Sequence, residues 1–166
     1  IVLSFFAAEA TFFGQSASVS HGVNLLLYLF TAFLLYYLLL YFWGDENQYI
    51  ALLTTLLFIV LPVHTEVVAS AKSRDELLAF LFALLSWHTY KQFINRHQTM
   101  YVPLAAILFL CACMSKPTMI PLTLLIPFSF YWFGKANKKQ VVTITLSLLL
   151  MFVTMYGLNN LIDSQD

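Results

Sequence analysis

The feature that most constrains this chain is a series of apolar runs without charged residues. The clearest run extends from Val23 to Trp43 and contains no Asp, Glu, Lys or Arg. A helix that crosses a bilayer needs about 20 mostly apolar residues, which this run supplies. Charged residues are 10% of the whole chain, against roughly 25% in a soluble domain. So few charges cannot cover a surface that faces water, and we expect lipid to surround most of the protein.

The apolar runs predict an all-α fold, a polytopic transmembrane helical bundle of about six spans. No repeat and no low-complexity linker divides residues 1–166, so we expect a single membrane domain. Residues 1–20 are apolar but interrupted by Glu9, Gly14 and Gln15, which favours an interfacial or re-entrant segment. Some runs are short, and a locally thin bilayer would accommodate them. The predicted spans are at about 22–43, 49–63, 74–90, 100–114, 117–133 and 140–158.

Basic residues in the connectors orient the bundle. The side that holds the connector after the first span, called side X, carries Lys91, Arg96, Lys135, Lys138 and Lys139. The opposite side, called side Y, carries Lys72, Arg74 and Lys116. Because cytoplasmic connectors have an excess of Lys and Arg, we expect side X to be cytoplasmic. Side Y is then extracytoplasmic, together with the N-terminal segment and the C-terminal tail.

Side Y also holds the densest polar segment of the chain, residues 61–76. Its ionisable side chains are His64, Glu66, Lys72, Arg74, Asp75 and Glu76. Ionisable groups at membrane depth are costly, so each of them is a functional candidate. A buried histidine is more often structural than catalytic, and one histidine with one carboxylate does not make a metal site. We therefore predict no metal ligands, and a divalent cation stays an open alternative.

Two polar clusters on side Y are typical of helix starts. Ser73 is followed three residues later by Glu76 and then by an apolar run, which predicts a capping box with Arg74 as the first helical residue. Ser115 is a reasonable N-cap for the fifth span, because Pro117 is tolerated in a first turn. Both clusters place a cation at the start of a helix on side Y.

The cations at these helix starts indicate an anion site. Three predicted helices begin on side Y with His21, Arg74 or Lys116 close by. The positive end of a helix dipole repels a cation, so the dipole does not explain Arg74 and Lys116. A phosphate bound between them would explain both. The alternative is that Arg74 pairs with Asp75 or Glu66 and that Lys116 extends to lipid headgroups.

Three pieces of the sequence resemble a known family. They are Leu61-Pro62-Val63-His64-Thr65-Glu66-Val67-Val68-Ala69 with Lys72-Ser73-Arg74-Asp75-Glu76-Leu77-Leu78, then His21-Gly22-Val23-Asn24-Leu25-Leu26-Leu27, and Ser115-Lys116-Pro117. Their order and spacing resemble the transmembrane and tetratricopeptide-repeat protein O-mannosyltransferases, which are similar to the GT-C membrane glycosyltransferases. The resemblance covers most of residues 1–133. Leu61 stands where that family usually has histidine.

The resemblance implies transfer of a sugar from a polyprenyl-phosphate donor on the extracytoplasmic side. It implies His64 and Glu66 as catalytic candidates, and His21, Lys72, Arg74 and Lys116 as ligands of the lipid phosphate. The main acidic base of that family would lie before Ile1, or be represented by Glu9. The tetratricopeptide repeats would follow the membrane domain. We therefore interpret the chain as part of a longer protein, and as an incomplete enzyme on its own.

Two other functions stay open. One is a non-catalytic membrane scaffold subunit of a larger complex, and the other is a transporter, for which the ionisable residues lie too close to one membrane edge. The expected partners are the lipid bilayer, the polyprenyl-phosphate sugar donor, a protein acceptor and other membrane subunits. A formal net charge of zero implies no nucleic acid. We expect a multi-pass protein of the plasma (inner) membrane or the endoplasmic reticulum membrane.

Overall fold

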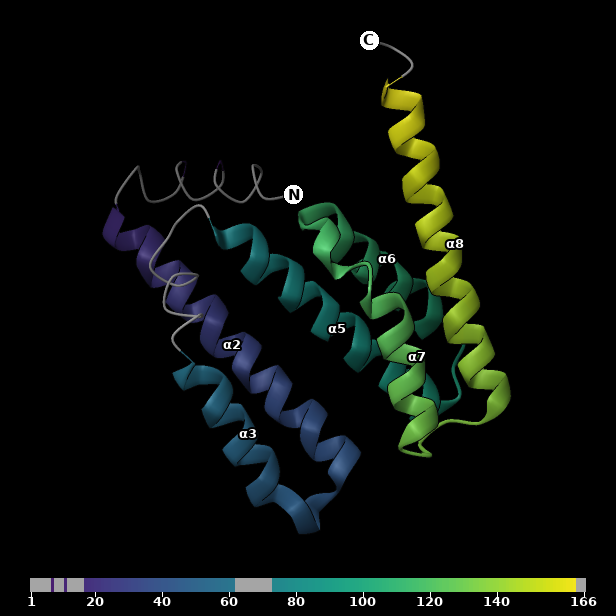
Figure 1. The fold of residues 1–166 in the computed structure, drawn as a ribbon, viewed down its shortest axis with the longest axis horizontal. Helices are drawn as coiled ribbons and strands as arrows, with labels where there is room; N and C mark the ends of the chain where they lie inside the picture. The colour runs from purple at the N-terminus through teal and green to yellow at the C-terminus, as the bar shows by residue number, and fades with distance from the viewer. Residues whose placement is uncertain (1–6, 8–10, 12–16, 62–72, 164–166) are drawn as a thin grey trace.

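The computed structural model describes residues 7, 11, 17–61 and 73–163, and these residues form helices joined by short connectors (Figure 1). The described part contains no strand, which confirms the predicted all-α class. Two short 3-10 helices, η1 (Asp45–Asn47) and η3 (Pro117–Met119), lie in connectors. The α-helices are α2 (Ala17–Trp43), α3 (Gln48–Val60), α5 (Arg74–Arg96), α6 (Tyr101–Ser115), α7 (Leu122–Trp132) and α8 (Lys138–Asp163).

Helix length supports fewer spans than the six that the sequence predicts. Among the fully described helices, one segment, Ser18–Trp43 of α2, is long and apolar enough to cross a membrane. α3, α6 and α7 have 13, 15 and 11 residues. At 1.5 Å per residue they reach about 16–23 Å, short of the roughly 30 Å hydrocarbon core. Length and apolar composition together therefore support a single candidate span among the described residues.

The predicted fifth span, 117–133, is the clearest departure from the expected boundaries. The chain turns through extended Lys116 (φ −153°, ψ 121°) into η3, and α7 starts only after Pro121. Ser115 is therefore not the N-cap of that span. It ends α6, where its Oγ donates to the Cys111 carbonyl at 2.9 Å. Prolines at 117 and 121 lack the N–H groups that a continuous helix would need, which divides the run in two.

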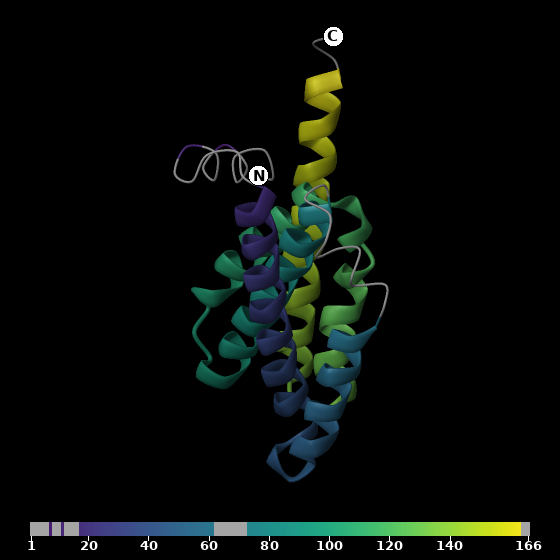
Figure 2. The ribbon, with the colours of Figure 1, turned by 90° about the vertical axis from the view of Figure 1, so that its left-hand side faces the viewer.

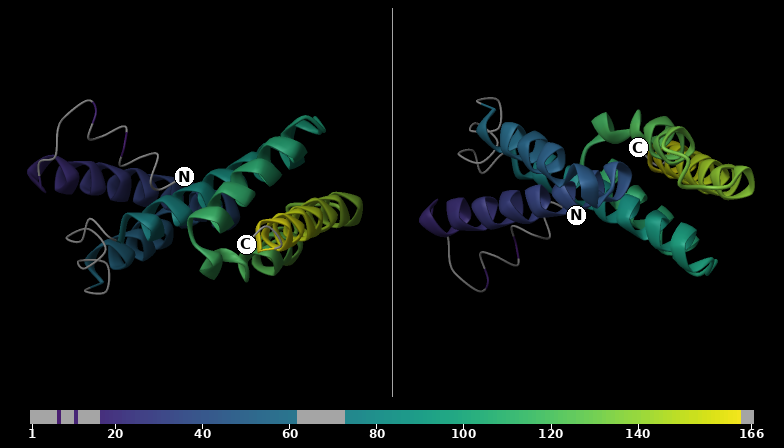
Figure 3. Two further views of the ribbon diagram at one scale, coloured as in Figure 1. Left: turned by 90° about the horizontal axis from the view of Figure 1, so that it is seen from above. Right: turned by 90° about the horizontal axis from the view of Figure 1, so that it is seen from below.

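Helix α5 is the centre of the molecule. Views along the molecule's other axes place α2 with α3 on one side of α5, and α7 with α8 on the other (Figures 2 and 3). α5 packs most closely along α6. The small residues Ala79 and Ala83 of α5 and Ala105 of α6 are completely buried, and Ser86 Oγ donates to the Ala105 carbonyl at 2.8 Å. Small side chains let two helix backbones approach closely, so this pair forms the tight core of the bundle.

Polar side chains tie α5 to the two helices that follow α6. The Trp87 indole Nε1–H donates to Ser129 Oγ of α7 at 3.2 Å. The Tyr90 and Ser147 hydroxyls, on α5 and α8, share a hydrogen bond of 2.8 Å. Trp87 also packs at the edge of Phe42 of α2, with ring centroids 6.3 Å apart. Different positions on α5 thus contact different neighbouring helices.

Three helices end on side X with a residue in the left-handed backbone conformation, at which φ is positive. Gly44 follows α2 with φ 81°, His97 follows α5 with φ 54°, and Gly134 follows α7 with φ 62°. This conformation lets the backbone turn sharply after a helix. Glycine adopts it without strain, whereas His97 adopts it at a cost. The three turns lie at one end of the bundle, and α8 extends past the other helices at the opposite end (Figure 1).

Candidate functional site

The start of α5 places the guanidinium of Arg74 inside the protein. Its side chain is completely buried, and it is the largest fully buried side chain in the described part of the chain. Arg74 Nε donates to Asn24 Oδ1 of α2 at 2.8 Å, and Arg74 Nη2 donates to the Ser20 carbonyl at 3.1 Å. Asn24 is also completely buried. Arg74 therefore joins α5 to the first turns of α2.

Lys116 lies on the same side, in the connector between α6 and η3. Its ammonium pairs with Glu76 Oε1 and lies 3.7 Å from Asp75 Oδ2. Its side chain is 25% exposed, and that of Glu76 is 45% exposed. The hydrogen bond from Lys116 to Glu76 is the main cause of a raised pKa of the lysine, and the charges of both acids add to it. Two carboxylates and one ammonium thus form a partly open cluster on side Y.

The local structure at Ser73 corrects the predicted capping box. α5 does begin at Arg74 with Ser73 as N-cap, as the sequence predicts. However, Ser73 makes no side-chain capping hydrogen bond. The Glu76 N–H donates to Asp75 Oδ1 at 2.9 Å instead, and the Glu76 carboxylate reaches Lys116. The prediction of a capping box is therefore wrong. The Glu76 carboxylate forms an ion pair with Lys116 and does not bond to the backbone of Ser73.

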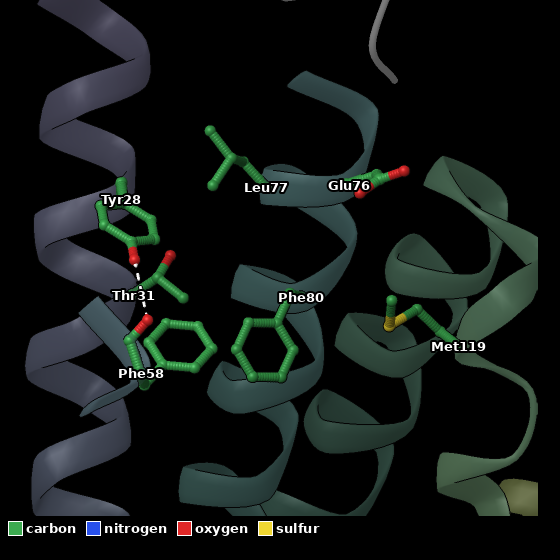
Figure 4. Close-up of a pocket in the computed structure, with 7 residues that line it drawn as sticks. All are labelled: Tyr28, Thr31, Phe58, Glu76, Leu77, Phe80 and Met119. Atoms are coloured by element: carbon green, nitrogen blue, oxygen red, sulfur yellow. Dashed lines mark hydrogen bonds between the residues drawn. The ribbon is translucent and has the colours of Figure 1, made fainter. Parts of the chain in front are cut away.

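A pocket of about 230 Å³ opens beside this cluster. Figure 4 shows Glu76 on α5 one turn above Phe80, with Met119 of η3 on one side and Tyr28 and Thr31 of α2 on the other. The lining is mostly apolar and comes from four elements: Tyr28, Thr31, Phe58, Glu76, Leu77, Phe80 and Met119. The pocket is therefore an apolar space with a carboxylate at its rim. Such a space suits an amphiphilic molecule.

Tyr28 fixes the wall that α3 contributes. Its hydroxyl donates to the carbonyl of Phe58 at 3.2 Å (Figure 4) and to that of Ile59 at 3.1 Å, both in the last turn of α3. The last carbonyls of a helix have no partner within the helix, so a hydroxyl here stabilises the end of α3. Its ring also stacks on Phe58 with centroids 6.0 Å apart. The sequence analysis missed Tyr28, although its spacing of four from Asn24 placed both on one face of α2.

The structure brings together only some of the predicted site residues. Arg74 and Lys116 both lie at the side Y end of α5, each with protein partners. His21 is exposed on α2, and Asn24 rather than His21 contacts Arg74. His64, Glu66 and Lys72 lie outside the described residues, so their roles stay predictions. Within the described ranges no group of three His, Cys, Asp or Glu side chains is arranged to hold a metal ion.

The site on side Y thus consists of a buried arginine, a lysine shared by two carboxylates, and an apolar pocket. Comparison of the chain with protein-family models, curated proteins and solved structures finds no match.

Proposed function

We propose that this chain is a multi-pass membrane domain that binds a polyprenyl-phosphate sugar on side Y, as part of a GT-C-type glycosyltransferase. The observation that carries the proposal is the Lys116–Glu76 pair at the rim of an apolar pocket. The resemblance of residues 21–27, 61–78 and 115–117 to the O-mannosyltransferase family supports it. The argument has two steps, membrane residence and ligand chemistry.

Membrane residence is supported by the outward-facing side chains. Large apolar residues are more than two-fifths exposed on helix after helix, among them Leu26 (68%), Leu57 (60%), Ile107 (52%), Leu124 (71%) and Leu150 (61%). A soluble monomer rarely exposes apolar patches of more than a few hundred Å². Exposure of these apolar faces is unfavourable in water, whereas contact with lipid chains carries no such free-energy cost.

The positions of the charged residues agree with that solvent. α2, α3, α6 and α7 contain no Asp, Glu, Lys or Arg. α5 has its charged residues in its first turn and near its last, and no charged residue lies between Val141 and Leu161 of α8. α8 has 26 residues, enough to cross about 30 Å. We propose that α2 and α8 cross fully, and that the bilayer thins around α3, α6 and α7.

The ligand chemistry follows from the pocket and its rim. The apolar lining suits an isoprenoid chain, and the Lys116 ammonium suits the phosphate. A phosphate that takes the place of Glu76 beside Lys116 leaves the Glu76 carboxylate available. That carboxylate can accept the proton of an acceptor hydroxyl while the hydroxyl oxygen bonds to the sugar. The bond from the sugar to phosphate breaks, and Lys116 stabilises the leaving lipid phosphate.

A non-catalytic scaffold is the second candidate, and the burial of Arg74 favours it. The Arg74 Nε–H and one Nη2–H donate to Asn24 and Ser20 within the protein. Those donors serve helix packing rather than a ligand. A scaffold with the fold of the membrane domain would need the contact between Arg74 and α2, but it would bind no sugar donor.

Binding of a long-chain polyprenyl phosphate to the full chain in detergent tests the proposal. We expect Lys116→Gln to weaken binding by roughly tenfold or more, because a charge-assisted hydrogen bond is worth about 1.5–3 kcal/mol. Lys116→Arg keeps the charge and should bind within a few-fold of wild type. Excess anionic phospholipid in the micelles saturates nonspecific basic surfaces. Equal binding by Lys116→Gln and wild type would contradict the phosphate site.

Sugar transfer by the longer protein separates the two candidates. In an enzyme, Glu76→Gln should keep polyprenyl-phosphate binding, because the lysine is freed, but lose most of its transfer rate if Glu76 is the base. A scaffold transfers no sugar with or without the substitution.

A further inference from the structure

Side X carries basic side chains that form no ion pair in the part of the chain that the structure describes. In residues 17–61 and 73–163, the ion pairs are those of Lys116 on side Y, and none involves a side X cation. The acidic residues of side X are Asp45 and Glu46, both exposed on η1. The basic set, called the side X cluster, is Lys91, Arg96, Lys135, Lys138 and Lys139. Positive charge at this end is therefore in excess.

Tyr41 holds two members of the cluster close together. The Lys91 ammonium lies 4.9 Å from the centroid of the Tyr41 ring, and the Lys135 ammonium lies 5.6 Å from it. The Tyr41 hydroxyl donates to Asn95 Oδ1 of α5 at 3.2 Å, which fixes the ring. Residues from α5 and from the α7–α8 connector thus meet on one aromatic platform of α2.

Gln140 fixes the position of the other lysines. Its side chain is buried, and its Nε2 lies 3.3 Å from both the Ile94 carbonyl and His97 Nδ1 at the end of α5. Its Oε1 accepts from the Asn137 N–H at 3.0 Å. Lys138 and Lys139, exposed just before Gln140, are therefore held beside the end of α5. Lys138 and Lys139 therefore lie at the same end of the bundle as Lys91 and Lys135.

Exposed aromatic residues lie at the same end of the bundle as the cations. Tyr131, Trp132 and Phe133 are 57%, 70% and 40% exposed at the end of α7, immediately before Lys135. Tyr49 is 75% exposed after η1. Aromatic side chains gather at the level of lipid headgroups, where their rings are partly in lipid and partly in water. A free phosphate or a nucleic acid in solution would not account for this apolar border.

We propose that the side X cluster binds the phosphates of anionic phospholipids in the membrane leaflet that it faces. The proposal rests on the membrane residence argued above, but not on the sugar-donor site. Each basic residue near an anionic membrane surface strengthens association, by roughly fivefold. The basic side chains supply the positive charge that attracts the phosphates, and the exposed aromatic residues set how deep this end of the protein lies in the leaflet.

Tryptophan quenching by brominated lipids measures the preference. The full chain is placed in vesicles that contain phosphatidylcholine and phosphatidylglycerol, with bromine on the acyl chains of one lipid at a time. Trp43 and Trp132, both at the side X ends of helices, report the lipids around them. We expect wild type to prefer phosphatidylglycerol at least fivefold at low salt, and to lose most of this preference near 1 M salt, where charges are screened.

Three variants decide the outcome. Lys138→Gln with Lys139→Gln should reduce the preference several-fold, and Lys138→Arg with Lys139→Arg should keep it. Asp45→Asn with Glu46→Gln should increase it, because this pair removes the opposing charge. An unchanged preference in the glutamine variant, or an equal loss in the arginine variant, would overturn the lipid surface. Quenching without any headgroup preference would also overturn it while membrane residence stands, whereas no quenching by either lipid contradicts membrane residence itself.

Discussion

Arg74 is the residue that most shapes the side Y end of this molecule. A buried guanidinium is costly unless hydrogen bonds replace its water, and Asn24 and Ser20 provide them. Asn24 and Ser20 are both on α2, so these two hydrogen bonds also join two helices. Lys116 differs, because its contacts with Glu76 and Asp75 are partly open to solvent. Arg74 and Lys116, which the sequence analysis predicts as ligands of the same phosphate, therefore have different surroundings.

Substitution of Arg74 should destabilise the fold rather than act on a ligand. Arg74→Met removes the donor to Asn24 Oδ1 and should cost roughly 3 kcal/mol or more, because the buried amide loses a charged partner. Arg74→Met combined with Asn24→Leu should cost less than the sum of the two single changes. Thermal unfolding in detergent measures the three variants. Strictly additive losses would show that the two side chains are not coupled.

At the level of elements, α5 combines packing and polar contacts in one helix. Alanines and Ser86 face α6, Trp87 reaches α7, and Tyr90 reaches α8. In lipid, helices gain little from apolar contact, so close packing and interhelical hydrogen bonds hold them together. The sequence of α5 is accordingly the most polar of the apolar runs. Its polar residues bind neighbouring helices, and they are not evidence of a transport path.

The contacts of α5 with α7 and α8 predict two independent losses. Trp87→Phe removes the donor to Ser129, and Tyr90→Phe removes the hydroxyl shared with Ser147. Tyr90→Phe should cost about 0.5–1.5 kcal/mol for the lost hydrogen bond, and Trp87→Phe should cost more, because the smaller ring also leaves a cavity beside Phe42. Tyr41→Phe, whose hydroxyl bond to Asn95 is exposed, is the control and should change stability much less. Equal losses in all three variants would argue against this role of α5.

At the scale of the whole molecule, the apolar and charged residues occupy different regions of the surface. The outer faces of the helices carry Leu, Ile, Phe and Val, and the charged residues lie toward the two ends. One end has a lysine balanced by carboxylates, and the other has basic residues in excess. If the proposed membrane residence holds, this asymmetry of charge would also orient the molecule in the bilayer.

A lysine on the outer face of α8 distinguishes lipid from water. Leu150 is 61% exposed, so Leu150→Lys would be harmless or favourable to a soluble protein. In lipid it should cost about 2.5–3.5 kcal/mol and reduce the membrane-inserted fraction, measured by alkaline extraction of membranes. Thr143→Lys, exposed near the basic end, is the matched control, since its ammonium can reach the headgroups. If Leu150→Lys inserts as well as Thr143→Lys, lipid does not surround this face.

The sequence was sufficient for the helical class and for the start of α5, because apolar runs and turn residues are local signals. It was insufficient for the partners of Glu76 and Arg74. The capping box at Ser73 is a favourable local arrangement, but Lys116, forty residues away, offers Glu76 an ion pair. Asn24 stands out in the sequence only as part of the segment 21–27 that resembles the family, because no neighbouring residue indicates that a guanidinium fifty residues away bonds to it. The roles of His64, Glu66 and Lys72 stay predictions.

The position of Arg74 at the leading end of α5 has a consequence for synthesis. A ribosome makes α2 and α3 before α5. The first residue of α5 is the one that bonds to α2. The arginine can therefore attach the central helix before α6, α7 and α8 exist, and every later helix is added to a core that is already anchored. A chain with a substitution at residue 74 would be expected to fail early in its assembly, before α6, α7 and α8 are made.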